Sequence, residues 1–362
     1  MVSAAIDVVV VCALVAWMVR FRPSPLGLLA GVGLVAGVLG VKLAAMVALG
    51  LDRQFGVLHV LWLDAVVVVP LAAVLLALLG WSGGGWALRA LVVLGLLMAP
   101  VGVYASFVEP NRLVVERTPV PLSPARAGTA PVDVAVLADI QFEHVGEHER
   151  EAVARVMALR PDVILLPGDY QQGSPAVFER ELPAIRALFA RLHAPGGVFA
   201  VEGDQEQTMA RTRRIFAGTD VRVLDNEIAT TRVGDRRFTV GGVEQWDGSA
   251  RAVAVAQALD DRPGTDDVRL LLVHHPTPIL RAAPNRRVDL IVAGHTHGGQ
   301  LQLPFIGPLT TASPVPREIA AGGLHTLDGR RIYVSRGVGV ERGAAPKLRL
   351  GAPPEISLLT LD

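Results

Sequence analysis

The sequence predicts two parts: a region of four transmembrane helices over residues 1–107, then an α/β or α+β domain over residues 132–362, with a mixed sheet core flanked by helices. Charge is the first sign, because residues 1–107 hold only eight of the 68 Asp, Glu, Lys and Arg side chains. Four apolar stretches in that part are long enough to cross a bilayer. Beyond residue 131, strand-like and helical periodicities alternate.

The four apolar stretches run over Val2–Val19, Pro25–Gly50, Val57–Leu79 and Trp86–Phe107. A bilayer crossing needs about 20 residues, and each stretch is near or above that length. Arg20 and Arg22 lie between the first two stretches and Arg89 lies at the start of the fourth, and Trp17, Trp81 and Trp86 lie at the same ends. Because positive charge favours the cytoplasmic side, we expect these connections to be cytoplasmic. The N-terminus and residues 108–362 are then expected outside the cytoplasm.

Two opposite charges interrupt the second and third stretches. Lys42 lies eight residues before Gly50, and Asp64 lies seven residues after Val57. With a rise of about 1.5 Å per residue, both would lie roughly 10–12 Å below the same surface of the membrane. We expect an ion pair that makes each charge tolerable in lipid. A proton or substrate path is the alternative interpretation.

Residues 108–131 are rich in proline and contain the alternating run Leu113–Arg117, which predicts a juxtamembrane linker with one edge strand. Residues Val221–Val243 alternate like antiparallel strands. The other strand-like segments are short and apolar, and the segments between them have helical periodicity. Strands are expected at Val132–Leu137, Val163–Leu166, Gly197–Val201, Arg269–Val273 and Leu290–Ala293, and helices at Glu149–Leu159 and Ala176–Leu192.

Carboxylates and imidazoles follow five of these strands. One such residue alone is commonly a turn or a helix cap, but ligands of open α/β sheets gather beyond the carboxyl ends of strands. Imidazole is a good ligand for zinc, manganese or iron. The series therefore predicts a metal site. Its members are Asp139, Asp169, Asp204, His274, and the pair His295 and His297 in Gly-His-Thr-His-Gly-Gly-Gln.

Composition excludes other classes of site. The formal net charge is zero, so there is no basic surface of the kind that binds nucleic acid. Cys12 is the only cysteine, which excludes internal disulfides and thiolate metal sites.

The series resembles the calcineurin-like metallophosphoesterases, whose blocks read Asp-x-His, Gly-Asp, Gly-Asn-His, a lone His and Gly-His-x-His. The last block here is the one common in the membrane-anchored branch of that family. The stretches Ile332–Gly339 and Pro353–Ile356 also resemble that branch. The resemblance covers roughly residues 108–362. It implies a mixed β-sandwich flanked by helices, with residues 132–362 as the phosphoesterase domain.

Carried over by position, the resemblance implies two divalent metal ions. Manganese, zinc, iron and magnesium all remain open, because the ligands are carboxylates, imidazoles and an amide. His274 matches the lone histidine better than His275, since it precedes an x-Pro step. The resemblance implies Gln205, Asp204 and His295 as catalytic residues. The implied ligands are Asp139, Gln141 and His297 for the first ion, Asp204, His274 and His295 for the second, and Asp169 as the bridge.

Three positions depart from the family pattern. Gln141 stands in place of a histidine ligand of the first metal, and Asp204 in place of asparagine. Gln205 stands in place of the histidine that contacts the scissile phosphate and assists the leaving group. An amide can donate a hydrogen bond but cannot shuttle protons, and general acid catalysis contributes about 10²–10⁴-fold. His144, His148 and His275 are candidate substitutes.

The function expected from this reading is a membrane-anchored phosphoesterase. Its substrate would contain a phosphomonoester, phosphodiester or pyrophosphate bond, and attachment to the bilayer favours a lipid-linked or envelope substrate. The alternative is a catalytically impaired descendant that binds metal or phosphate and acts as a sensor or scaffold, which Gln141 and Gln205 favour. A transporter with an appended domain is a third interpretation.

Overall fold

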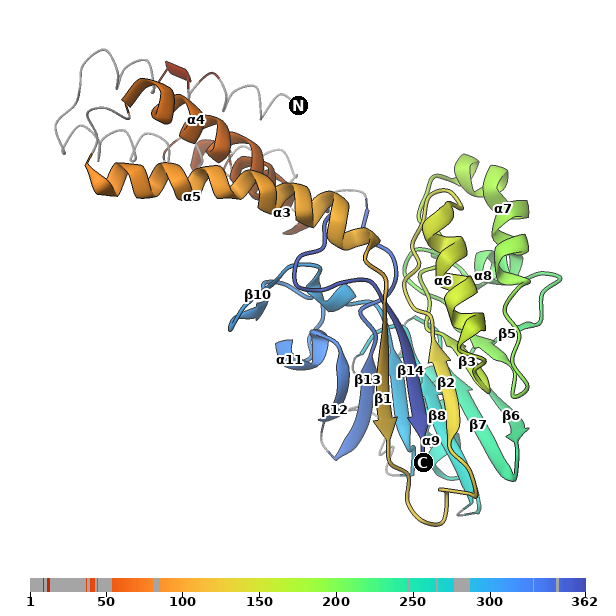
Figure 1. Ribbon diagram of the computed structural model, residues 1–362. Helices are drawn as coiled ribbons and strands as arrows, with labels where there is room; N and C mark the ends of the chain where they lie inside the picture. Colours follow the sequence, from red (N-terminus) through yellow and green to blue (C-terminus); the bar gives the residue numbers. More distant parts are fainter. Residues whose placement is uncertain are drawn as a thin grey trace. The chain divides into compact units, whose positions relative to one another are not determined.

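The computed structural model describes residues 54–80, 85–245, 248–264, 266–276, 287–327, 329–342 and 345–362, with a few isolated residues between 9 and 44 (Figure 1). The chain divides into two compact units. The first comprises Met1–Val108 with Glu341–Lys347, and the second comprises Glu109–Val340 with Leu348–Asp362.

The first unit contains long apolar helices. Among the described residues, two helical stretches, Gly56–Leu78 and Arg89–Asn111, are long and apolar enough to cross a membrane. They correspond to the third and fourth predicted spans, whereas the first two predicted spans lie outside the described residues, isolated positions apart. The helical segments of this unit are α3 (Gln54–Leu63), η1 (Asp64–Val68), α4 (Val69–Gly80), α5 (Trp86–Val103) and η2 (Tyr104–Val108), and η3 (Glu109–Asn111) follows at the start of the second unit.

Two glycines allow close packing between these helices. A Cβ atom at Gly95 of α5 would lie 2.8 Å from the Cβ atom of Ala73 in α4. One at Gly102, seven residues further along, would lie 2.5 Å from the Cβ atom of Val66 in η1. Positions i and i+7 share a helix face, so this face of α5 carries small residues where the helix backbones approach. Small residues at such contacts are common between helices in lipid.

The predicted ion pair between Lys42 and Asp64 is confirmed. The Lys42 Nζ atom lies 3.1 and 3.0 Å from the two carboxylate oxygens of Asp64. Both side chains are largely buried within this unit. A close pair of opposite charges lowers the cost of placing either charge among apolar side chains.

The second unit contains two six-stranded mixed sheets. In the first sheet the strand order is β1-β14-β2-β3-β4-β5, and only the β14–β2 pair is antiparallel. The strands of this sheet are β1 (Val114–Val120), β14 (Glu355–Leu361), β2 (Val132–Val136), β3 (Val163–Leu166), β4 (Val198–Ala200) and β5 (Val221–Val223).

In the second sheet the order is β12-β13-β9-β8-β7-β6, with parallel pairing from β13 to β7 and an antiparallel hairpin at each edge. A two-stranded sheet, β10 (Gln302–Leu303) with β11 (Gly307–Pro308), projects from the loop after β9. The strands of the second sheet are β12 (Gly323–Leu327), β13 (Arg330–Val334), β9 (Leu290–Ala293), β8 (Asp267–Leu272), β7 (Arg236–Gly242) and β6 (Glu227–Val233).

The two sheets pack face to face and form the central core. Val134 and Leu165 of the first sheet belong to one buried cluster with Phe238 and Leu270 of the second. Strand side chains alternate between the two faces of a sheet, so the opposite faces need their own cover. Helices supply it, and the predicted mixed α/β sandwich is confirmed.

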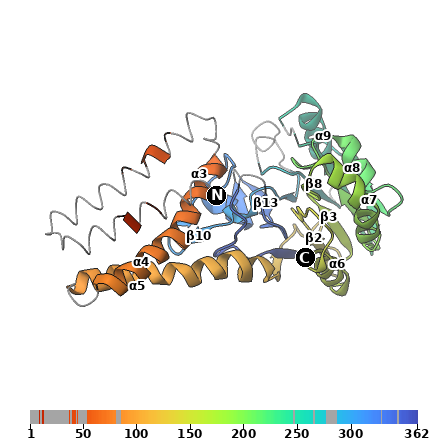
Figure 2. The same cartoon turned by 90° about the horizontal axis from the view of Figure 1, so that it is seen from above.

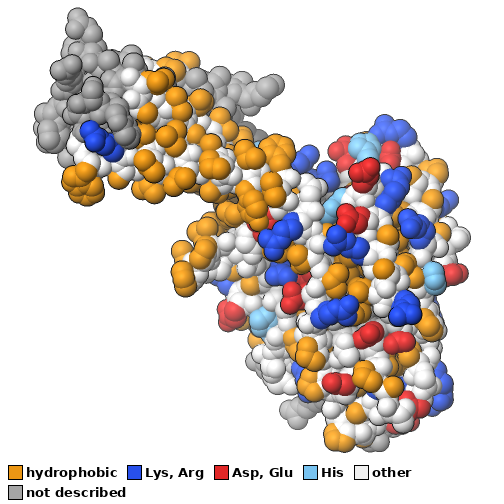
Figure 3. Space-filling view, in the orientation of Figure 1, with side chains coloured by type: hydrophobic (Ala, Val, Ile, Leu, Met, Phe, Trp, Pro, Cys, Tyr) orange, Lys and Arg blue, Asp and Glu red, His pale blue; other side chains and the backbone are white. Residues whose placement is uncertain are grey.

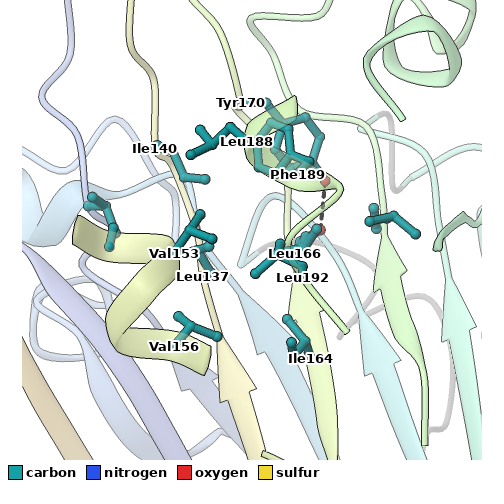
Figure 4. Packing of buried hydrophobic residues seen from close by; sticks show 14 of the residues in the cluster. Leu137, Ile140, Val153, Val156, Ile164, Leu166, Tyr170, Leu188, Phe189 and Leu192 are labelled. Carbon is teal, nitrogen blue, oxygen red and sulfur yellow. Dashed lines mark hydrogen bonds between the residues drawn. The ribbon is translucent and has the colours of Figure 1, made fainter. Parts of the chain in front are cut away.

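Helices α6 (Glu147–Ala158), α7 (Pro175–Phe189) and α8 (Met209–Ile215) cover the outer face of the first sheet (Figures 1 and 2). Figure 4 shows Val153 of α6 beside Leu137, which follows β2. The hydroxyl of Tyr170 donates a 2.8 Å hydrogen bond to the Leu166 carbonyl in the same cluster. Helices α9 (Ala250–Asp260) and α11 (Arg317–Ala320) cover the second sheet.

Most predicted elements lie within a few residues of their observed bounds, and Val163–Leu166 is β3 itself. One expectation was wrong in part. Strands β6 and β7 within Val221–Val243 do pair antiparallel, but β5 pairs parallel with β4 and completes the first sheet. The predicted edge strand is β1, which pairs with β14.

We predict that the Lys42–Asp64 pair acts as a unit in lipid. Lys42→Leu or Asp64→Leu alone would remove this opposite charge from its neighbour, and a charge at the centre of a membrane-spanning helix costs about 2.5–3.5 kcal/mol on insertion scales. The double variant should therefore accumulate in membranes to a higher level than either single variant, measured by immunoblotting of membrane fractions. Equal abundance of all three variants would contradict the coupling.

Candidate metal centre

The two sheets bring the predicted polar residues together where their strands end. Asp139, Asp169 and Asp204 follow β2, β3 and β4, which are neighbours in the first sheet. His274 follows β8 and His295 follows β9 in the second sheet. Their ligand atoms form two groups, with members within 4.8 Å of one another and His274 in both. The groups are Asp139, Asp169 and His274, and Asp204, His274, His275 and His295.

His274 is completely buried between the two groups. Its Nδ1 atom donates a 2.8 Å hydrogen bond to the Pro167 carbonyl, so Nδ1 carries a proton and Nε2 is the nitrogen on the side of the carboxylates. Nε2 lies 3.5 Å from Asp169 Oδ1 and 3.8 Å from Asp204 Oδ2. Burial opposes protonation, but the two carboxylates outweigh it and raise the pKa of His274 well above its usual value.

Asp139 and Asp169 are buried carboxylates with little compensation. Burial raises the pKa of Asp139 to about 6, although His274 opposes the shift. Burial also raises the pKa of Asp169 well above its usual value. Asp139 Oδ1 accepts a 2.9 Å hydrogen bond from the His295 backbone N–H, and Asp169 Oδ1 accepts one of 2.9 Å from that of Gln205. Two carboxylates in this position require positive charge to ionise fully.

Three ligand atoms in the centre are buried and have no hydrogen-bond partner among the described residues. They are Asp139 Oδ2, His274 Nε2 and His297 Nε2. An unsatisfied buried polar atom costs about 1–3 kcal/mol, which a bound cation would offset. Carboxylate oxygen and neutral imidazole are also the donors that divalent transition metals accept. The residues present therefore fit divalent metal binding.

Asp204 is surrounded by imidazoles. His275 Nε2 lies 3.0 Å from each of its carboxylate oxygens, and His295 Nδ1 lies 3.1 Å from Oδ2. Burial opposes ionisation, but the nearby imidazoles of His274, His275 and His295 outweigh it and hold the pKa of Asp204 far below its usual value. The sequence placed only His274 of the adjacent pair at the site, whereas the structure brings both rings to Asp204.

The remaining predicted residues lie around this centre. His297 is buried and belongs to neither group, and its Nδ1 atom lies 3.3 Å from the Nη2 atom of the buried Arg349. Gln141 is also completely buried. Gln205 is partly exposed, and its backbone N–H contacts Asp169. The structure thus joins Asp139, Asp169, Asp204, His274 and His295 directly, with His297 set apart.

The backbone at the centre adopts conformations that most residues avoid. Asp139, Asp169, His295 and His297 have φ angles of 46°, 57°, 71° and 49°. Such left-handed conformations cost on the order of 1–3 kcal/mol each and cluster at functional sites. The approach is also close, because a Cβ atom at Gly294 would lie 2.5 Å from Asp139 Oδ2. Packing of the loops therefore holds the ligand residues in place.

Glu206, which the sequence did not indicate, connects two of these loops. Its buried carboxylate accepts backbone hydrogen bonds of 2.9–3.3 Å from Asp169, Tyr170, Gln171 and Gly203. These N–H groups lie in the loops after β3 and β4, so Glu206 fixes Asp169 relative to Asp204. The only sign of Glu206 in the sequence is its position two residues after Asp204, in the loop that follows β4.

The sequence profile of the calcineurin-like phosphoesterase family matches residues 132–299, from β2 to the loop after β9. Phosphodiesterase YaeI of Escherichia coli K12 is 30% identical over 244 residues, which cover 64% of this chain and 83% of that protein. The chain belongs to the calcineurin-like phosphoesterase family. Members of this family hydrolyse phosphoester bonds and use divalent metals.

Two further relatives match most of their own length. Metallophosphoesterase YkuE of Bacillus subtilis 168 is 26% identical over 265 residues, which cover 71% of this chain and 88% of the relative. UDP-2,3-diacylglucosamine pyrophosphatase LpxG of Chlamydia trachomatis serovar D is 24% identical over 330 residues, which cover 73% of this chain and 94% of the relative. The phosphoesterase resemblance found in the sequence is confirmed.

We predict that Glu206→Gln destabilises the domain and weakens metal binding. An amide retains one acceptor oxygen but turns an N–H group toward two of the four backbone donors. Each buried donor left unsatisfied costs about 1–3 kcal/mol, so unfolding should become easier by about 2–6 kcal/mol. The matched control is Glu179→Gln, which alters an exposed pair with Arg214, and exposed ion pairs contribute little to stability. Thermal unfolding and metal content, both unchanged in Glu206→Gln, would contradict this role.

Proposed function

We propose that the chain is a membrane-anchored, metal-dependent phosphoesterase. The observation that carries the proposal is a set of buried side-chain atoms that have no hydrogen-bond partner among the described residues, on Asp139, His274 and His297. Asp139 and His274 form one group with Asp169, and His274 forms a second group with Asp204, at the strand ends where the family profile matches. No purely structural role explains why the fold buries these donors together.

The proposed ligands fall into two sets. Asp139, Gln141 and His297 would hold one cation, and Asp204, His274 and His295 the other, with Asp169 between them. Divalent cations in these sites would supply an activated water and neutralise the phosphoryl oxygens. The metal is proposed from manganese, zinc, iron and magnesium, which accept this mixture of carboxylate and imidazole.

The residues of the chain would position the substrate rather than carry out every proton transfer. The backbone N–H of Gln205 donates a hydrogen bond to Asp169. The side-chain amide of Gln205 can donate a hydrogen bond to a phosphoryl oxygen. It cannot protonate the leaving group. His275 Nε2 lies against Asp204, beside the centre.

We further propose a lipid-linked or envelope substrate and an extracytoplasmic domain. Two described helices are long and apolar enough to cross a membrane. The sequence of the first 53 residues supports two more spans, which would give an even number. The name of the Chlamydia relative describes a pyrophosphatase of UDP-2,3-diacylglucosamine, a nucleotide-linked lipid. A pyrophosphate bond has a good leaving group, which suits a site with Gln205.

The second candidate is a catalytically impaired protein that binds metal or phosphate as a sensor or scaffold. Gln141 and Gln205, in place of two family histidines, favour it. Purified full chain, reconstituted with manganese and assayed against a bis-aryl phosphodiester, separates the two. Metal binding without turnover would support the sensor and contradict the enzyme.

We predict a steep dependence of the rate on the pKa of the leaving group. Aryl phosphates or pyrophosphates should turn over, whereas simple alkyl phosphates should scarcely react, because Gln205 offers no proton to the departing oxygen. Gln205→His should raise the rate on poor leaving groups by up to about 10²–10⁴-fold and on good ones much less. Asp169→Asn should abolish both activities. A flat dependence that Gln205→His leaves unchanged would contradict this role of Gln205.

We predict that protease added to intact cells or spheroplasts digests residues 108–362. The arginines at 20, 22 and 89 favour cytoplasmic connections, and therefore an outer location for the domain. A periplasmic or surface protein that is cut under the same conditions serves as the control. Complete protection of the domain would reverse the proposed orientation.

A further inference from the structure

A hydrophobic hairpin projects next to the candidate metal centre. It consists of β10 and β11, joined by Pro304, Phe305 and Ile306. Phe305 is 108% exposed and Ile306 is 61% exposed, so the tip presents one fully exposed and one mostly exposed large apolar residue. The sequence contains no charged residue between His297 and Arg317. Figure 3 shows hydrophobic side chains gathered on the projection that Figure 1 labels β10.

The exposure of the tip is built into its backbone. Phe305 has a φ angle of 66°, which is rare for a bulky side chain and holds the ring away from the hairpin. The Ile306 N–H donates a 3.2 Å hydrogen bond to the Leu303 carbonyl, and the Leu309 N–H donates one of 3.2 Å to the Leu301 carbonyl. The turn is therefore closed and ordered, and it presents its apolar side chains outward.

The base of the hairpin is attached to the loop that carries the metal-site histidines. The side-chain amide of Gln302 donates hydrogen bonds of 2.9 Å to the Gly298 carbonyl and 3.0 Å to the Ala321 carbonyl. His295 Nε2 lies 3.3 Å from the Ala312 carbonyl, just beyond the second strand of the hairpin. These hydrogen bonds connect the hairpin to the histidine loop. A surface that binds the tip would therefore lie at a fixed distance from the histidine loop.

We propose that the hairpin tip Pro304–Ile306 enters the interfacial layer of the lipid bilayer. The inference rests on the membrane attachment proposed above. The chain itself favours lipid as the occupant, because the apolar helical stretch ends at Asn111 and β1 begins at Val114. Three residues span at most about 11 Å, so a bilayer holding that helix lies close to the start of the domain. An uncharged tip with an aromatic and an aliphatic side chain suits the membrane interface.

Insertion of the tip would set the distance between the metal centre and the lipid phosphates. The four residue-to-residue steps from Leu301 to Phe305 span roughly 13 Å at a strand rise of about 3.3 Å. The histidine loop would then lie near the headgroup layer, where the phosphate of a lipid-linked substrate is found. The substrate would not need to leave the bilayer to reach the site.

The experiment uses the full chain in lipid nanodiscs, with Cys12→Ser removing the only native cysteine. Phe305→Cys and, as a second tip position, Ile306→Cys carry an environment-sensitive fluorophore. Leu97→Cys on α5, at a side chain 53% exposed, reports helix insertion. Ala217→Cys, in the exposed turn between α8 and β5, is the matched control in the domain. Lipids bearing a nitroxide on the acyl chain quench fluorophores that lie in the bilayer.

The proposal expects blue-shifted emission and several-fold stronger quenching at Phe305 and Ile306 than at Ala217. Quenching at Leu97 together with tip signals equal to that of Ala217 would overturn the hairpin inference and leave the membrane attachment intact. A blue shift at the tip without lipid quenching would assign it to a protein partner and also overturn the inference. Absence of quenching at Leu97 would remove the membrane attachment, and the hairpin inference with it.

Discussion

Three carboxylates, on Asp139, Asp169 and Glu206, are buried together at the ends of the central strands, and the arrangement of the domain follows from how each is compensated. Glu206 is satisfied by four backbone N–H groups, which fix the loops after β3 and β4. Asp139 and Asp169 accept fewer backbone hydrogen bonds, and burial raises the pKa of all three carboxylates. A buried carboxylate is costly to ionise unless positive charge lies nearby. The fold therefore places the carboxylates, and a bound cation would supply the compensating positive charge.

The fold was predictable wherever its signal was local. The buried run Val163–Leu166 and the helical periodicity of Glu149–Leu159 identify β3 and α6, because side-chain burial repeats every two or 3.6 residues. Pairing across the chain gives no such signal. The parallel pairing of β1 with β14 joins residues more than two hundred positions apart, and β5 stays beside β4 in the first sheet whereas β6 begins the second. The hairpin at Gln302–Pro308 has two-residue strands, too short to show alternation.

The candidate site divides in the same way. Asp139, Asp169 and Asp204 could be predicted because each follows a strand. The two-histidine turn could be predicted because of the spacing of its histidines. Glu206 was missed because its partners are backbone N–H groups. Nearly every residue has such a group, so the sequence does not indicate which ones Glu206 contacts. The approach of His275 to Asp204 depends on ring orientation after a strand, which an adjacent His-His pair does not determine. Gln205, by contrast, was visible at once as a departure from the family pattern.

The strand order of the first sheet has a consequence for the way the domain is made. Strand β14 lies between β1 and β2, yet it follows every other strand along the chain. While the polypeptide is being synthesised, β1 and β2 are separated by an unfilled place, and both leave backbone groups unpaired until residues 355–361 emerge. In the proposed extracytoplasmic location, a sheet that is completed last would let the chain cross the bilayer through a narrow translocation channel before the domain closes.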